Sequence, residues 1–306
     1  RRVHGGAAIF VPVNHLTVFP SASGKVTTFN EMTKVGIVVV FDFDKTIVDV
    51  DSDNWVVDEL GLTDLFNDLL PTMPWNSLMD TIMGEIHSRG STVEDVANVL
   101  KRIPIHPRTV AAIESAHALG CDLRIVSDAN MFFIETVLDH LGLLEFFSEI
   151  NTNPGYVDGR GCVRILPYND FIKCPHGCAL CPPNMCKGLI IERIQSDLIF
   201  EGEKTMIYMG DGSGDYCPSL RLKETDFVLP RRDFPLWQLI RKNPSMVKAQ
   251  EHDWVAGEEQ QRVLLQIIKS TSSGASRMLS SDCRLQITSV DCPIGGFPKS
   301  VPLRQQ

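Results

Sequence analysis

The sequence predicts an α/β fold in which a parallel sheet is covered by helices on both faces. Three observations lead to this prediction. A run of β-branched apolar residues, from Val35 through Ile37 to Val40, is typical of a strand buried on both faces. Helical and strand-like segments then alternate along the chain. Polar side chains follow three of the expected strands, at the edge where ligands of open α/β sheets bind.

The first expected strand ends in two aspartates, Asp42 and Asp44, with one residue between them. Side chains two apart on an extended chain point the same way, so we expect the two carboxylates to lie close together. They would repel each other unless a proton or a cation lay between them, and Mg²⁺ prefers such hard oxygen ligands. One aspartate can attack phosphorus, while the other serves as general acid and base. Taken alone, the pair also fits a strand-end turn with solvated or helix-capping acids.

A helical segment without strand-like alternation is expected over residues 53–104. Asp53 could cap its first helix, and Glu94 could complete a capping box at the start of its last one. Because the segment directly follows the first strand, we place it over that strand's end, where a lid would lie. The expected helices run from about Asn54 to Leu70, from about Trp75 to His87, and from after Ser91 to before Pro104.

Beyond residue 104 the pattern alternates regularly. A β-hairpin is expected between Tyr156 and Tyr168, with its turn at Asp158-Gly159. The remaining expected helices cover residues 107–119, 130–141, 187–198 and 259–269, and the remaining strands cover residues 121–128, 147–152, 205–209 and 226–229.

The strand ends carry groups that one kind of chemistry needs together. A phosphoryl-transfer site requires a nucleophile, a proton donor, a hydroxyl and a cation for the phosphoryl oxygens, and acids that hold a metal. Lys187 opens a helix whose first amides favour an anion, and glycines around Asp211 let its carboxylate reach an ion. The groups are Asp42 and Asp44 after the first strand, Ser127 after the second, Lys187, and Asp211 and Asp215 after the fourth.

Composition is that of an ordinary globular protein of 306 residues, 43% hydrophobic and 22% charged. The net charge of −9 argues against nucleic acid or an anionic membrane as the main partner. No apolar run reaches about 18 residues, so no transmembrane helix is expected. The negative charge would also repel a phosphorylated substrate, so the small phosphorylated partner that the motifs indicate needs local cations or a metal at its site. The odd number of cysteines favours a reducing compartment and a cytoplasmic location, while oligomeric state is left open.

The two ends differ from the middle in composition. Residues 1–34 are predicted to be a disordered extension, with the fold starting near Met32, although the first thirty residues contain no acid and also fit a transit peptide. Residues 270–306 are rich in Ser, Pro and Gly and are predicted to be a disordered tail. The predicted core then comprises residues 35–52 and 105–269, with a helical cap at 53–104.

The nine cysteines include a cluster shortly before Lys187. Their types and spacing could hold Zn²⁺. However, one C-x-x-C is present, and the last cysteine directly precedes Lys187, so reduced thiols packed in a loop that orients Lys187 are the preferred interpretation. The candidate ligands are Cys174, Cys178, Cys181 and Cys186, with His176 among them.

Together these motifs resemble the haloacid dehalogenase (HAD) superfamily of phosphatases, through D-F-D-K-T, the strand-end Ser, the Lys and G-D-G-x-G-D. The longer stretches F-D-F-D-K-T-I-V-D-V-D-S-D-N-W, I-V-S-D-A-N, C-P-P-N-M-C-K-G and G-D-G-S-G-D-Y-C-P resemble the phosphoethanolamine/phosphocholine phosphatase family. The likeness is greatest to its plant members, some of which act on inorganic pyrophosphate. It covers about residues 35–269 and implies a Rossmann-like core with a helical C1 cap inserted after the first strand.

The resemblance implies roles at the phosphoryl end of the site. Asp42 would be the nucleophile and Asp44 the general acid and base. Thr46, Ser127 and Lys187 would bind the phosphoryl group. Mg²⁺ would be held by Asp42, the backbone carbonyl of Asp44 and Asp211, with Asp215 in support.

At the other end of the site, the resemblance implies that Asp53 and Asp128 bind a cationic amine on the substrate. An ammonium group suits an acidic or aromatic pocket. The alternatives are a helix N-cap for Asp53 and a loop acid that binds its own backbone for Asp128. The tryptophans Trp55, Trp75 and Trp237 are expected to serve packing rather than a choline cage.

The predicted function is Mg²⁺-dependent hydrolysis of phosphocholine or phosphoethanolamine through an aspartyl-phosphate. Inorganic pyrophosphatase is the alternative, followed by pyridoxal or thiamine phosphate phosphatase, because the motifs act on the phosphoryl group and not on the leaving group. An inactive binding protein of HAD fold is the alternative from another class. The intact set of catalytic groups argues against it.

Overall fold

The computed structural model describes residues 36–170, 173, 175–199, 202 and 204–282, with side chains described as far as Ser273. These residues fall within one compact unit of the chain, residues 34–306. The predicted disordered extension at residues 1–34 lies outside the described residues.

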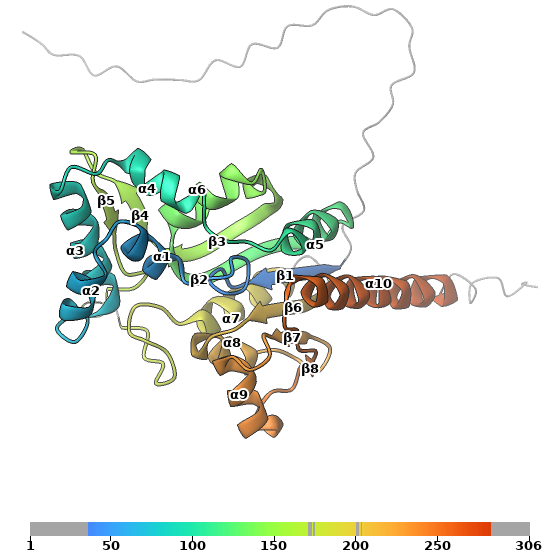
Figure 1. The fold of residues 1–306 in the computed structure, drawn as a ribbon. Helices are drawn as coiled ribbons and strands as arrows, with labels where there is room; N and C mark the ends of the chain where they lie inside the picture. The colour runs from blue at the N-terminus through green and yellow to red at the C-terminus, as the bar shows by residue number, and fades with distance from the viewer. Residues whose placement is uncertain (1–35, 171–172, 174, 200–201, 203, 283–306) are drawn as a thin grey trace, which may run out of the picture. The chain divides into compact units, whose positions relative to one another are not determined.

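A parallel sheet of six strands forms the centre of the described chain, in the order β3-β2-β1-β6-β7-β8 (Figure 1). The first strand of the chain, β1, lies between β2 and β6 and is buried along its whole length. The α/β prediction is confirmed, and β8 is the one strand of this sheet that was not expected. The strands are β1 Ile37–Phe41, β2 Asp122–Asn130, β3 Phe147–Asn153, β6 Thr205–Gly210, β7 Phe227–Pro230 and β8 Gln250–Glu251.

Helices cover both faces of this sheet, which explains why β1 is apolar at successive positions. Ile37, Val39 and Phe41 share a core with α5, α6 and α10. Val38 and Val40 share a second core with α7 and α9. The helices are α5 Pro107–Ala118, α6 Met131–His140, α7 Lys187–Leu198, α8 Tyr216–Ser219, α9 Pro235–Lys242 and α10 Gly257–Asp282, with short 3₁₀ helices at Leu144–Phe146, Ser213–Asp215 and Pro244–Met246.

Between β1 and α5 the chain forms the helices α1 Ser52–Glu59, α2 Thr63–Leu69, α3 Trp75–Ser88 and α4 Val93–Leu100. The single helix predicted from Asn54 to Leu70 is wrong, because Gly61 adopts a φ of +70° and breaks it into α1 and α2. The N-caps of α1 and α4 also differ from the prediction.

Asp51, and not Asp53, is the N-cap of α1: its backbone is extended and its side chain accepts from the amide of Asn54. Asp53 lies within the first helical turn, where a residue cannot act as the cap. At α4 the capping box joins Thr92 and Asp95 rather than Ser91 and Glu94. Both predicted caps were therefore wrong by one or two residues. The carboxylate of Asp53 is not used in capping and is available for another role.

The predicted hairpin is present as β4 Gly155–Val157 and β5 Val163–Ile165, which pair antiparallel. Its strand β5 packs against α3, and β4 contacts α6 (Figure 1). The guanidinium of Arg164 donates to the carboxylate of Asp80 at 2.7 Å, and the amide of Ile165 donates to the same carboxylate at 3.0 Å. The hairpin is thus fastened to the helical segment that follows β1.

The last helix, α10, continues to Asp282, so the predicted start of disorder at Ser270 is wrong for residues 270–282. The hydroxyls of Ser270 and Ser272 donate to the carbonyls of Ile267 and Ile268, which lets serines sit within a helix. Residues 283–306 lie outside the described residues. No described helix is long and apolar enough to cross a membrane.

Candidate active site

The chain turns sharply where β1 ends. The amides of Thr46, Ile47 and Val48 all donate to the carbonyl of Phe43, at 3.3, 2.8 and 3.2 Å. Lys45 adopts a φ of +53° within this turn. Because the strand stops at Phe41, the extended geometry that predicted parallel carboxylates on Asp42 and Asp44 does not apply. Asp42 is buried and Asp44 is half-buried, and their carboxylates contact different groups.

The ammonium of Lys187 joins three acids from separate segments. Its Nζ lies 3.0 Å from Oδ1 of Asp42, 2.9 Å from Oδ1 of Asp215 and 3.5 Å from Oδ1 of Asp128. Lys187 is the first residue of α7 and is 3% exposed. The structure therefore brings together the ends of β1, β2 and β6 at the N-terminus of α7, as the order of the motifs predicted.

Asp215 is the most heavily bonded acid of the group. Its Oδ1 also accepts from the hydroxyl of Tyr208 at 2.7 Å, and its Oδ2 accepts from the amides of Asp211 at 3.1 Å and Gly212 at 2.9 Å. A Cβ at Gly210 would come within 2.5 Å of this carboxylate, which explains the glycine there. Asp215 thus shapes the loop that carries Asp211 and fixes Lys187. The sequence analysis did not identify Tyr208, although its phenol is the one polar tip within β6 near the strand's end.

Burial dominates the electrostatics of these groups. It raises the pKa of Asp42, and the charge of Asp215 adds to this increase while Lys187 opposes it. Burial alone would favour the neutral amine of Lys187, but the charges of Asp215, Asp42 and Asp128 outweigh it and raise the pKa of the ammonium. Burial, followed by the charge of Asp215, raises the pKa of Asp211 to about 7.

Three carboxylates form a candidate metal centre. One oxygen from each of Asp42, Asp211 and Asp215 lies within 4.8 Å of the others. This donor set fits Mg²⁺, which prefers oxygen ligands, and a cation there would offset the repulsion and burial that raise the pKa of Asp42 and Asp211. The carboxylate of Asp44 lies outside this group and accepts from the amide of Ser52 at 3.0 Å.

Two of the predicted site residues, Thr46 and Ser127, carry buried hydroxyls. Oγ1 of Thr46 is buried and has no hydrogen-bond partner among the described residues. The carbonyl of Thr46 accepts from Gln260 at 2.8 Å, which holds the residue in place. Oγ of Ser127 accepts from the amide of Ala129 at 3.3 Å, so its proton remains available to an acceptor. Both hydroxyls were predicted site residues.

An acidic cavity of about 320 Å³ adjoins this group. Asp53 is buried in its wall, where its Oδ2 accepts from the indole of Trp75 at 2.6 Å. Burial raises the pKa of Asp53 to about 7, and the charge of Asp51 adds to the increase. Asp51 itself lies 3.8 Å from the ammonium of Lys45. The lining residues are Asp44, Asp51, Asp53, Trp75, Asp128, Pro182 and Asn184.

The cavity is lined by three predicted site residues, among them the catalytic candidate Asp44, and by several that were missed. Asp53 and Asp128 were predicted, and Trp75 was expected only to pack. It does pack edge-on against Phe66, but it also faces the cavity. Asp51 could have been found from the spacing V-D-V-D-S-D, and Asn184 from its place within C-P-P-N-M-C-K-G.

The cysteine cluster has a different membership from the predicted one. The sulfurs of Cys178, Cys181, Cys186 and Cys217 lie within 4.8 Å of one another. Cys174 lies outside the described residues. His176 is not part of the group, since its ring contacts the carbonyl of Pro182 at 2.8 Å. Cys217 comes from α8, directly after the motif that supplies Asp211 and Asp215.

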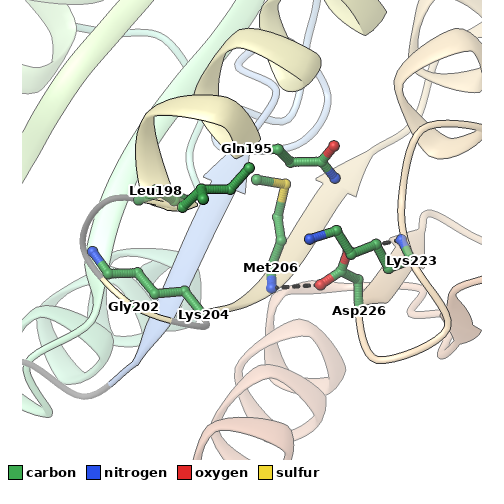
Figure 2. A pocket seen from close by; sticks show the side chains of 8 residues that line it. Gln195, Leu198, Gly202, Lys204, Met206, Lys223 and Asp226 are labelled. Carbon is green, nitrogen blue, oxygen red and sulfur yellow. Dashed lines mark hydrogen bonds between the residues drawn. The ribbon is translucent and has the colours of Figure 1, made fainter.

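A second cavity lies at the opposite end of β6 (Figure 2). Met206 at the start of β6 and Leu198 at the end of α7 line it. Its acid, Asp226, accepts from the amides of Met206 at 2.9 Å and Lys223 at 2.8 Å, so it holds the backbone of the fold. This cavity is separated by the length of the strand from Asp211 and does not contribute to the acidic site.

Comparisons with known proteins agree with this arrangement. The model of the Putative Phosphatase family matches residues 37–268. The chain is 61% identical to Inorganic pyrophosphatase 2 of Arabidopsis thaliana over 265 residues, which cover 84% of this chain and 95% of the relative. It is 30% identical to the human phosphoethanolamine/phosphocholine phosphatase over 246 residues, which cover 76% of this chain and 89% of the relative.

The fold is also found among solved structures. A HAD family hydrolase from Salmonella enterica superposes with a TM-score of 0.51 at 13% identity, over 72% of this chain and 68% of the other. The α/β fold with a parallel sheet is therefore similar to that of this hydrolase.

Proposed function

The chain belongs to the Putative Phosphatase family and is a phosphatase on a HAD fold, and we propose that it hydrolyses small phosphomonoesters with a cationic amine through an aspartyl-phosphate on Asp42. The observation that carries the proposal is the contact of Lys187 with Asp42 and Asp215, at 3.0 and 2.9 Å, beside a cavity lined by further acids. A buried cation at a buried carboxylate provides a place for a phosphoryl group next to a nucleophile.

Asp42 is the nucleophile in this proposal. Its Oδ1 accepts from its neighbour's amide, Phe43, at 2.7 Å and contacts Lys187. These contacts hold the carboxylate in one orientation, so its second oxygen can attack phosphorus. Lys187 and the hydroxyls of Thr46 and Ser127 then bind the phosphoryl oxygens. The unpartnered Oγ1 of Thr46 supports this role, because a ligand oxygen would satisfy it.

Asp44 acts as general acid and base. It protonates the oxygen of the leaving group when Asp42 attacks, and it later removes a proton from the water that hydrolyses the aspartyl-phosphate. Partial burial and the charges of Asp51 and Asp53 raise the pKa of Asp44, which favours the protonated form that the first step needs. The amide of Ser52 holds the carboxylate at the mouth of the acidic cavity.

Mg²⁺ is the proposed cofactor, and Asp42, the backbone carbonyl of Asp44 and Asp211 would hold it. When bound it supplies positive charge that offsets the charge of the phosphoryl oxygens. Asp215 would support the metal site indirectly by positioning Lys187 and the loop of Asp211. Its oxygens already accept from Lys187, Tyr208 and two backbone amides.

The acidic cavity favours an amine head group. Asp53 and Asp128 would face the cation, and the indole of Trp75 supplies an aromatic wall that also suits a trimethylammonium group. An anionic leaving group would meet repulsion from these acids unless it carried a cation with it. The leaving groups that fit are therefore choline and ethanolamine.

Inorganic pyrophosphate is the second candidate substrate. One specific observation favours it, namely the 61% identity to a relative named Inorganic pyrophosphatase 2. The phosphoryl end of the site would serve pyrophosphate equally well, and Mg²⁺ bound to the second phosphate would offset its charge near the acids. The two candidate substrates differ only in the leaving group that the acidic cavity must accept, which is a cationic alcohol in one case and a phosphate in the other.

The test is a substrate panel at fixed Mg²⁺ that contains phosphocholine, phosphoethanolamine, pyrophosphate, pyridoxal phosphate and thiamine monophosphate. We expect the two amine esters to have the highest kcat/KM, and we expect turnover to stop when Mg²⁺ is removed. A kcat/KM that is highest for pyrophosphate would replace the main proposal by the second. No hydrolysis of any of the five would contradict both.

A further inference from the structure

The cysteine cluster joins two segments that are far apart in the sequence. Cys178, Cys181 and Cys186 lie in the segment before α7, and Cys217 lies in α8. The segment from residue 175 to residue 186 contains no helix or strand, yet Cys186 and Cys217 are 2% and 1% exposed. A segment without regular structure needs some other interaction to fix it, and four converging thiols can provide one.

The distances between the sulfurs match those of ligands around one tetrahedral ion. Sγ of Cys217 lies 3.7 Å from Sγ of Cys178 and 3.9 Å from Sγ of Cys186. With Zn–S bonds of about 2.3 Å, the corners of a tetrahedron lie about 3.8 Å apart. All four sulfurs lie within 4.8 Å of one another. An iron–sulfur cluster would spread its thiolates over several iron atoms, whereas these sulfurs are close enough to share a single ion.

The absence of a side chain at Gly188 leaves room for Sγ of Cys217. A Cβ at residue 188 would come within 2.5 Å of Sγ of Cys217, so Gly188 permits the close approach of α8 to the first turn of α7. Figure 1 shows α7 and α8 side by side at this point, and the two helices are in contact. The cluster thus lies against the helix that Lys187 begins.

We propose that Cys178, Cys181, Cys186 and Cys217 bind one structural zinc ion that fixes the segment before α7 against α8. A closed site of four thiolates is typical of structural zinc, since no ligand position remains for water or substrate. The ion would hold Pro182 and Asn184 in the wall of the acidic cavity and Cys186 next to Lys187. This inference is independent of the substrate and of the magnesium centre.

The first experiment measures metal in the wild-type protein. The chain is expressed in medium containing zinc, purified without chelator, and dialysed against buffer with Mg²⁺ to remove zinc from carboxylate sites. Elemental analysis should find about one zinc per chain, as expected for a closed tetrathiolate site. Refolding with Co²⁺ in place of zinc should give the thiolate-to-metal charge-transfer bands of a tetrahedral site, which a carboxylate site cannot produce.

The second experiment compares two cysteine substitutions. Cys217→Ser should lose the zinc and the charge-transfer bands, because it removes the ligand shared by both short sulfur distances. Cys162→Ser is the matched control: this buried thiol lies in the hairpin, outside the cluster, and the variant should keep the full zinc content. Equal zinc contents in the two variants would overturn the assignment to these four residues.

The wild-type result alone can also overturn the proposal, whether or not the variants fold. A folded and dialysed chain that contains no zinc, and that gives no thiolate bands with Co²⁺, would mean that the four thiols pack without metal. Mass analysis that finds a disulfide among the four cysteines of the freshly purified chain would overturn it as well, because the paired sulfurs could not ligate an ion.

Discussion

The two ends of the active site are built in different ways. At the phosphoryl end, Asp42, Lys187 and Asp215 are buried and in contact, so negative charge is matched by a cation within 3.0 Å. In the acidic cavity, Asp53 is similarly buried, and its partner in contact is the neutral indole N–H of Trp75, at 2.6 Å. In the first region one ammonium contacts the acids without balancing all of their charge, which leaves a place for a metal cation. In the second region Asp53 forms no ion pair among the described residues, so a substrate's cation would offset its charge.

Under the proposed function, the first region would set the chemistry and the second would set the specificity. The phosphoryl end is made from strand ends of the core, so any phosphate substrate meets the same groups there. The cavity is made largely from the helical segment after β1 and the segment before α7, where small changes alter the charge that the leaving group meets. Substitutions at the first end should therefore affect all substrates, and those at the second should discriminate among them.

The largest effect is expected from Asp42→Asn. The amide cannot attack phosphorus, so kcat should fall at least about 10³-fold for every substrate. Circular dichroism and the Tm should stay close to those of the wild type, because Asn is nearly isosteric. Retention of a tenth or so of the activity would remove Asp42 from the role of nucleophile.

Lys187→Met should reduce kcat by about 10²-fold and also destabilise the protein. Without the ammonium, Asp42 and Asp215 remain buried beside each other, and an unpaired buried charge costs about 3–5 kcal/mol. Urea unfolding measures the loss, and turnover of phosphocholine and pyrophosphate measures the catalytic effect. If only one of the two substrates were affected, the proposed distinction between the ends of the site would be wrong.

Asp53→Asn is the substitution that separates the two candidate substrates. Loss of its charge should lower kcat/KM for phosphocholine by about tenfold and leave that for pyrophosphate unchanged or higher. Asp64→Asn, an exposed acid of the neighbouring helix, is the charge-matched control and should leave both unchanged. Equal losses for both substrates would take the head-group role from Asp53.

The raised pKa of Asp53 predicts how stability depends on pH. The folded carboxyl has a pKa of about 7, and an unfolded Asp has one of about 4, so the native state binds a proton that the unfolded state releases between these values. Its contribution to the free energy of unfolding therefore falls as the pH rises through this window.

Asn does not titrate, so Asp53→Asn should gain stability relative to the wild type from about pH 4 to pH 8, by about 1.4 kcal/mol per unit of pKa difference. Urea unfolding of both proteins at several pH values measures this. A difference between the two proteins that does not change with pH would contradict the assignment of the raised pKa to Asp53.

The smallest effect is expected from Tyr208→Phe. Asp215 would lose one of its hydrogen bonds but keep Lys187 and two amides, so the cost should be about 1 kcal/mol. kcat should change by less than about threefold, because Tyr208 touches no substrate group in the proposal. A loss as large as that of Lys187→Met would show that the phenol does more than support Asp215.

The order of the strands and their polar ends could be predicted because each depends on local pattern. A buried strand must be apolar, and the polar groups that follow it must lie at one edge of a parallel sheet. This is how Asp42, Ser127, Lys187 and Asp211 were found. The geometry within the turn after Phe41 could not be predicted, because it depends on hydrogen bonds to a single carbonyl.

Contacts between segments that are far apart in the chain could not be predicted from the sequence either. Cys217 joins the cysteine cluster only because α8 packs on α7. Trp75 reaches Asp53 only because the chain brings the start of α3 back to the first turn of α1. The end of α10 was misplaced because serines that bond to their own helix look like a disordered tail in composition. The predicted helix ends and caps likewise differed from those in the structure by a few residues, because a single glycine or a single acid determines each of them.

The most direct test of the account is to trap phosphate on the enzyme. Wild-type protein with Mg²⁺ and an excess of substrate is quenched in acid within milliseconds, digested and mapped by mass spectrometry. The account predicts one phosphoryl group on the peptide that contains Asp42, and none in Asp42→Asn. Rapid release of phosphate with no adduct, or an adduct on another residue, would contradict it.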